Sequence, residues 1–75
     1  MTKLPVISGL DAIKAFRRAG FIVVRQRGSH VRMKKVTGEK VINITVPMHD
    51  ILKKGTLHHL VNDSGLTLDE FLEFL

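Results

Sequence analysis

His30 is the residue of this chain best suited to chemistry, because it lies within a run of cations. The run extends from Arg25 to Arg32 and has Gly28 and Ser29 at its centre. A neutral imidazole can take up a proton near neutral pH, as a general base must. Neighbouring cations can bind a phosphate and stabilise the charge that develops on it during phosphoryl transfer. These residue types predict proton transfer at a bound phosphate. The alternative is a histidine that contacts only solvent or backbone.

A second pair of cations, Lys53 and Lys54, precedes a predicted helix. Free backbone N–H groups at a helix N-terminus bind phosphate, and lysines beside them add positive charge. The stretch from Lys53 to Thr56 is therefore a candidate phosphate site. An ordinary helix start with two solvated lysines explains the same residues equally well.

The four histidines do not have the spacing of a metal site. His58 and His59 are adjacent, and adjacent side chains on a helix point about 100° apart. There is no cysteine, which excludes a thiolate zinc site. No Walker-type loop, nucleophile elbow or dinucleotide fingerprint is present. We therefore expect no metal and no cofactor.

The turn at Gly28 and Ser29 predicts which side chains share a face of the sheet. Gly followed by another residue is typical of a two-residue type II′ hairpin turn. Such a turn sets three cross-strand pairs: Arg27 with His30, Arg25 with Arg32, and Val23 with Lys34. Side chains alternate between faces along a strand, so one face is predicted to be basic and the other apolar. The predicted basic face carries Arg25, Arg27, His30, Arg32 and Lys34, and the predicted core face carries Ile22, Val24, Val31 and Met33.

A second turn, from Thr37 to Lys40, leads into a third strand that ends at Pro47. Pairing Val36 with Val41 gives the same division into faces. It sets Met33 beside Ile44 and Val31 beside Val46 on the core face, with Lys34 beside Asn43 and Arg32 beside Thr45 on the basic face.

Helices are predicted on both sides of these strands. Ser8 and Asp11 form a capping box for a helix over 9–19, buried through Leu10, Ile13 and Phe16 and ended by Gly20. Thr56 is the predicted N-cap of a helix over 56–64, and Thr67 with Glu70 caps a short helix from 68. With strands over 21–27, 30–36 and 41–46, the sequence predicts a two-layer α+β fold.

Composition limits the cellular setting and the partners. The chain has 75 residues and 44% hydrophobic residues, which suffices for one small domain over 1–75. No apolar run approaches the ~20 residues that span a bilayer, and the first residues lack the apolar core of a signal peptide. We expect a cytoplasmic protein without a membrane segment. The formal charge of +5 is suited to a polyanion or an acidic protein partner.

Several short stretches recur in the order known for one protein family. They are Ser8-Gly9, Gly20-Phe21, Arg25-Gln26 before Gly28-Ser29-His30, Val46-Pro47 with His49, residues 52–57, and Gly65-Leu66-Thr67 with Glu70-Phe71. Across nearly the whole chain, the sequence resembles the HicA toxins of toxin–antitoxin pairs. The resemblance implies a fold similar to the double-stranded RNA-binding domain. It implies an mRNA interferase with His30 as its catalytic histidine, and a HicB antitoxin as partner.

The simplest mechanism for such an enzyme is attack of the RNA 2′-hydroxyl on the adjacent phosphate, with His30 as the base. We expect RNA to be bound by Arg25, Arg27, Ser29, Arg32, Lys34, Lys53 and Lys54. Two alternatives remain open. One is a non-catalytic RNA-binding module that recognises backbone and 2′-hydroxyls by shape. The other is a protein-interaction domain whose basic face serves an acidic partner.

Overall fold

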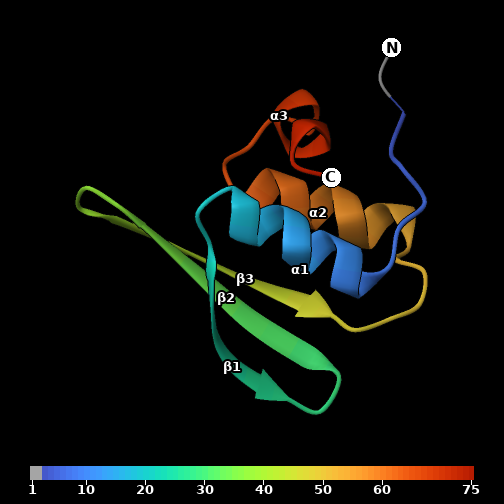
Figure 1. Ribbon diagram of the computed structural model, residues 1–75, viewed down its shortest axis with the longest axis horizontal. Coiled ribbons are helices and arrows are strands. Elements are labelled where there is room, and N and C mark those ends of the chain that lie inside the picture. The colour runs from blue at the N-terminus through green and yellow to red at the C-terminus, as the bar shows by residue number, and fades with distance from the viewer. Residues whose placement is uncertain (1–2) are drawn as a thin grey trace.

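The computed structural model describes residues 3–75, so the predicted domain range of 1–75 includes two residues outside the described part. The elements in order are α1 (Gly9–Arg18), β1 (Ile22–Arg27), β2 (His30–Thr37), β3 (Lys40–Pro47), α2 (Lys54–Asp63) and α3 (Leu68–Glu73). The strands form one antiparallel sheet in the order β1-β2-β3, and the helices lie together on one side of it (Figure 1). The predicted α+β layout is confirmed.

The core lies between the helices and one face of the sheet. Phe16 of α1 is fully buried between Phe21 and Phe71, with ring centroids 5.6 and 5.0 Å away. The sheet contributes Val31, Met33, Ile44 and Val46 to the same cluster. Among the helices of residues 3–75, none covers the opposite face of the sheet, and we call it the open face.

Two of the three predicted helix starts are confirmed. Ser8 and Asp11 form a reciprocal capping box, in which the Asp11 N–H donates to Ser8 Oγ at 3.0 Å. The same motif opens α3, where the Thr67 N–H donates to Glu70 at 2.9 Å. Gly20 ends α1 with a φ of +106°, as expected for a glycine after a helix.

The start of α2 and the position of Leu10 were predicted wrongly. The helix begins at Lys54, with Lys53 as an N-cap that makes no side-chain capping bond, so Thr56 lies inside the first turn. Leu10 is 47% exposed because Ala12, Ala15 and Phe16 define the buried stripe of α1. At about 100° per residue, Leu10 lies on the outer side of that stripe.

The second hairpin pairs as predicted, and the first does so only near its turn. Every predicted pair between β2 and β3 is present. In the first hairpin Arg27 pairs with His30 and Arg25 with Arg32. A β-bulge then shifts the register, so that Val23 pairs with Met33 and Ile22 with Lys34. The predicted pair of Val23 with Lys34 is therefore wrong.

The bulge also corrects which β1 side chains face the core. The extra residue is Val24, and the residues of a bulge oppose one residue of the partner strand. Val24 lines a hollow of the open face together with Arg25 and Arg32. Ile22 pairs with Lys34 and lies on the open face as well. The prediction that Ile22 and Val24 face the core is wrong, and Phe21 is the buried side chain of this segment.

The β2–β3 hairpin extends beyond β1. Because the first residue of β1, Ile22, pairs with Lys34, residues 35–42 have no β1 partner. We call residues 35–42 the arm, and it projects to the left in Figure 1. Within residues 3–75, no helix is long and apolar enough to cross a membrane.

Candidate nucleic-acid interface

His30 shares a hollow of about 130 Å³ on the open face with Arg25, Arg27, Arg32 and Thr45. The register explains this grouping, since Arg27 is paired with His30, and Arg32 lies between Arg25 and Thr45 in adjacent strands. The sequence predicted all four basic side chains of this group. Thr45 was placed on the basic face but was not identified as a site residue.

Two contacts hold the turn that carries His30. Gly28 has a φ of +59°, as the first central residue of a type II′ turn requires. Ser29 has no positive φ, since all described residues with a positive φ are glycines, and this fits the second central position. The Gln26 side chain donates to the Gly28 carbonyl at 3.1 Å. The Met48 N–H donates to the Ser29 carbonyl at 2.6 Å. The backbone before His30 is thereby held both by a residue of β1 and by the residue that follows β3.

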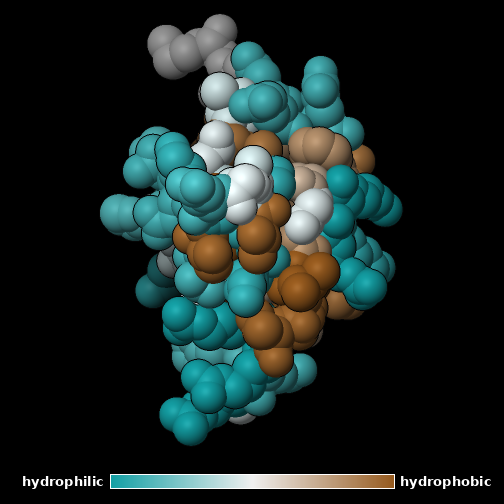
Figure 2. Space-filling view, turned by 90° about the vertical axis from the view of Figure 1, so that its left-hand side faces the viewer, coloured by the Kyte–Doolittle hydropathy of each residue, from teal (hydrophilic) through white to brown (hydrophobic). Residues whose placement is uncertain are grey.

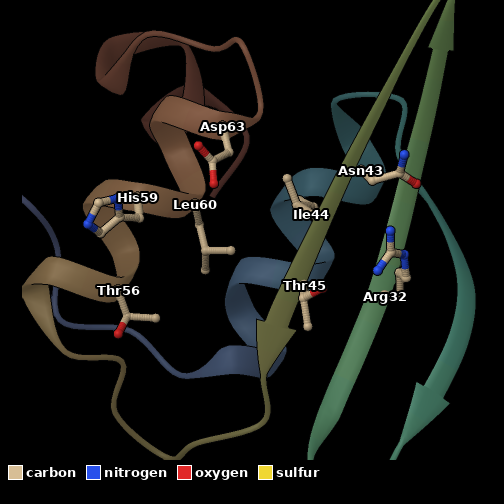
Figure 3. Close-up of a pocket in the computed structure, with 8 residues that line it drawn as sticks. All are labelled: Arg32, Asn43, Ile44, Thr45, Thr56, His59, Leu60 and Asp63. Atoms are coloured by element: carbon tan, nitrogen blue, oxygen red, sulfur yellow. The ribbon is translucent and has the colours of Figure 1, made fainter.

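A larger hollow of about 450 Å³ leads from this site across β3 to α2. Figure 3 shows β3 running between α2, which carries Thr56, His59 and Asp63, and β2, which carries Arg32. The other lining residues are Asn43, Ile44, Thr45 and Leu60. Sequence analysis did not identify the α2 residues of this hollow. Their spacing of three and four residues puts them on one side of the helix and could have indicated a shared surface.

A third hollow of about 290 Å³ lies further along the open face and is lined by Val24, Arg25, Arg32, Lys34 and Asn43. Arg32 therefore lines all three hollows. The three hollows together form one surface, which we call the basic surface. The strands that carry most of it contain no aspartate or glutamate, and Asp63 of α2 adds one carboxylate to the hollow across β3.

The predicted binding residues outside the strands are not brought into the His30 hollow. Lys53 and Lys54 are exposed at the start of α2 and line none of the three hollows. The first intrahelical bond of α2 is donated by Leu57 to the Lys53 carbonyl. The N–H groups of the preceding turn are thus available to a ligand. Ser29 is exposed, and its carbonyl already accepts a hydrogen bond from Met48.

In residues 3–75, no three side chains of metal-ligating type lie close enough together to hold a metal ion. The arrangement that is present consists of exposed guanidinium groups around one imidazole. It can bind phosphates in sequence along a chain and offer a proton acceptor beside one of them.

A comparison with protein families gives one match, over residues 9–66. The matching family is described as the HicA toxin of bacterial toxin–antitoxin systems. A comparison with curated proteins gives no match. The matched range begins at α1 and includes the whole sheet, His30 and α2. It covers more than half of the chain, and this protein belongs to the HicA toxin family, the toxins of toxin–antitoxin pairs.

Proposed function

We propose that this toxin is an endoribonuclease that cuts messenger RNA in the cytoplasm and arrests translation, with His30 as general base. The observation that carries the proposal is the hollow in which the His30 imidazole lies among Arg25, Arg27 and Arg32. A toxin of a toxin–antitoxin pair needs a target in the cell, and RNA is the polyanion whose own 2′-hydroxyl supplies a nucleophile.

The reaction needs only groups of the protein, the RNA and water. His30 takes the proton of a 2′-hydroxyl, and O2′ forms a bond to the adjacent phosphorus. The bond between phosphorus and O5′ breaks, and O5′ takes a proton from water, which in turn takes the proton held by the His30 imidazolium. The products are a 2′,3′-cyclic phosphate and a free 5′-hydroxyl. Arg27 and Arg32 stabilise the added negative charge of the phosphorane by charge-assisted hydrogen bonds.

The remaining cations bind the RNA on either side of the cut. Arg25 and Lys34 continue the basic surface along the strands. On the other side, the hollow across β3 leads to α2, whose first turn carries Lys53 and Lys54. His59 also lines this hollow, but its ring points away from Arg32 in Figure 3, so we assign it no part in proton transfer.

The test uses purified protein and a transcript free of ribosomes. Wild type is expected to cleave it and to leave cyclic phosphate and 5′-hydroxyl ends. His30→Ala should lower the rate at saturating RNA by at least ~10²–10⁴-fold, the usual contribution of a general base. His58→Ala removes an exposed imidazole of α2 outside the basic surface, so it should cleave at the wild-type rate. Full activity of a folded His30→Ala protein would refute the assignment.

One observation favours a second candidate, a non-catalytic RNA-binding module. No side-chain hydrogen bond orients the His30 imidazole within the described residues, whereas general bases are usually held by a partner. RNA binding by wild type without cleavage, and equal binding by His30→Ala, would establish this candidate in place of the first.

A further inference from the structure

The open face of the sheet is divided into a basic half and an apolar half. The basic half surrounds the turn between β1 and β2 and contains His30. From Val24, which borders the basic half, towards the opposite end, four aliphatic side chains face solvent: Ile22 (60% exposed), Val24 (50%), Val36 (61%) and Val41 (53%). We call these four residues the apolar patch.

Strand pairing shows that the apolar patch is continuous. Val36 and Val41 are direct cross-strand partners on the arm. Ile22 pairs with Lys34, which puts it diagonal to Val36, at a separation of roughly 7–8 Å. Lys34 lies in the row of Ile22, with Val36 on one side and Val24 on the side of the basic half, and it is half-buried. Its aliphatic stem therefore lies along its neighbours, while its ammonium group joins the basic half.

Figure 2 shows the molecule from the side to which the arm projects. Hydrophobic side chains gather there in one patch with hydrophilic side chains around it. A grouped and polar-rimmed apolar patch on a small protein indicates a site of association with another protein, unlike single exposed aliphatic residues, which are common.

RNA as a ligand accounts for the residues of the basic half of the open face but not for those of the apolar patch. Its phosphates gain nothing from valine or isoleucine, and bases stack on aromatic rings, which the apolar patch lacks. A protein partner explains both halves, since an interface has an apolar centre and a charged rim. Membership in the HicA family supplies such a partner, the antitoxin.

We infer that the antitoxin packs an aliphatic ridge against the apolar patch, so that its contact extends along the arm beyond the His30 hollow. That RNA and the antitoxin compete for the basic half rests on the proposed function. The apolar contact itself does not depend on it.

The two halves of the open face should govern different rate constants of antitoxin binding. Long-range attraction to the cations governs the association rate and its salt dependence. Short-range packing on the apolar patch governs the dissociation rate, as it does in most interface variants. A substitution in the patch should therefore change the dissociation rate without changing the salt dependence of association.

The test compares the double variant Val36→Thr/Val41→Thr with Val6→Thr in binding to the purified cognate HicB-type antitoxin. Threonine keeps the β-branched shape that strands favour, so the fold should be retained. Val6 is 75% exposed and lies in the chain before α1, which makes it a matched control. We expect the double variant to raise the antitoxin Kd at least about 10-fold through faster dissociation, as loss of a central contact does. RNA cleavage by the free double variant should be unchanged.

The outcomes separate the competing explanations. A folded double variant with wild-type Kd, or an equal loss in Val6→Thr, would overturn the inference. A second copy as the occupant would show as a wild-type dimer in sedimentation that the double variant converts to monomer, with antitoxin binding unchanged. That result would overturn it too. If wild type cuts no RNA and the double variant still loses the antitoxin, the proposed function fails while the docking surface stands.

Discussion

At the scale of single residues, Arg32 connects the parts of the basic surface. It lines all three hollows and lies between Arg25 of β1 and Thr45 of β3. A guanidinium group can hold two phosphate oxygens at once in a planar fork, which an ammonium group cannot do. Under the proposed function, Arg32 is thus the cation placed to contact RNA both beside His30 and on the way to α2.

Replacing Arg32 should therefore affect binding more than a comparable loss of charge elsewhere. We expect Arg32→Ala to weaken RNA binding by about 10-fold, with Arg32→Lys recovering only part of the loss. The slope of log K against log salt should fall by ~0.7 for the lost contact to single-stranded RNA. Arg17→Ala, which removes the same charge from α1, is expected to leave that slope unchanged. Equal effects of the two substitutions would show that only net charge matters.

Two glycines give opposite predictions for the same substitution. A Cβ on Gly9 would clash with the Pro47 carbonyl oxygen, so Gly9→Ala must displace α1 from the end of β3. The Gly9 N–H also donates to the His49 carbonyl at 2.8 Å. We expect a loss of ~1–3 kcal/mol in unfolding free energy, as for overpacking.

Gly55→Ala provides the comparison, because nothing lies within 4 Å of a Cβ there and the residue is helical. Alanine should stabilise the protein by ~0.5–1 kcal/mol. Urea unfolding of both variants measures the difference. A Gly9→Ala protein as stable as wild type would contradict the close approach of α1 and β3.

At the scale of elements, sequence determines the β2–β3 hairpin well and β1 poorly, for a physical reason. The alternation of Val31 and Met33 with cations and polar residues leaves one register that buries the apolar side chains. Residues 22–24 are Ile-Val-Val, a run without alternation. Insertion of one residue there leaves the pattern unchanged, so the bulge could not be predicted. The basic group around His30 was predicted because it lies on the turn side of the bulge.

The start of α2 escaped prediction for a related reason. A threonine that is followed by helical residues has the same local sequence pattern whether it is the N-cap or a residue of the first turn. Thr56 occupies the latter position, and the N-cap residue, Lys53, makes no side-chain capping bond. The lysines were nevertheless placed correctly at the helix start. The hollow between α2 and β3 depends on tertiary packing and was not predictable from local patterns.

The capping box of α3 gives a prediction of stability. Thr67→Ala removes the hydroxyl that accepts from the Glu70 N–H at 3.1 Å, and a lost cap costs about 1 kcal/mol. Because Phe71 of this helix packs on Phe16, the loss should affect the whole fold. Thermal unfolding should show a Tm lower by ~4–8 °C. An unchanged Tm would mean that α3 frays independently of the core.

The same box makes part of the stability depend on pH. The backbone N–H of Thr67, followed by its hydroxyl, holds the pKa of Glu70 below its ordinary value of 4.5. A carboxyl with a lowered pKa stabilises the fold above its unfolded value, and the contribution is lost as pH falls through the folded value. Wild type should therefore exceed Glu70→Gln in Tm at pH 7, and the difference should shrink below pH 4.5. A difference that is equal at pH 7 and pH 3 would contradict this contribution.

At the scale of the whole molecule, charge is segregated. The strands carry cations and no carboxylates, whereas Asp63, Asp69, Glu70 and Glu73 lie in α2 and α3. A polyanion is therefore attracted most strongly to the sheet, because cations and carboxylates are mixed on the helices. Under the proposed function, this asymmetry orients RNA before any close contact forms.

Removing the two lysines at the start of α2 tests how far the RNA footprint extends. Lys53→Ala/Lys54→Ala should weaken RNA binding and reduce the salt slope by ~1.4 for two lost phosphate contacts. Cleavage at saturating RNA should stay close to wild type, because neither lysine lines the His30 hollow. Binding measured from low to moderate salt, with single-turnover cleavage in parallel, separates the two effects. An unchanged slope would limit the footprint to the sheet.

The arm that extends past β1 has a consequence for how such toxins diversify. Residues 35–42 hold no part of the His30 hollow, and most of their side chains face solvent. Substitutions in the arm can accumulate together with compensating ones in the antitoxin while the turn that carries His30 stays fixed. Two descendants of one toxin–antitoxin pair could then coexist in a cell without neutralising each other's toxins. Divergence between such relatives should be concentrated in the arm and low around residues 25–32.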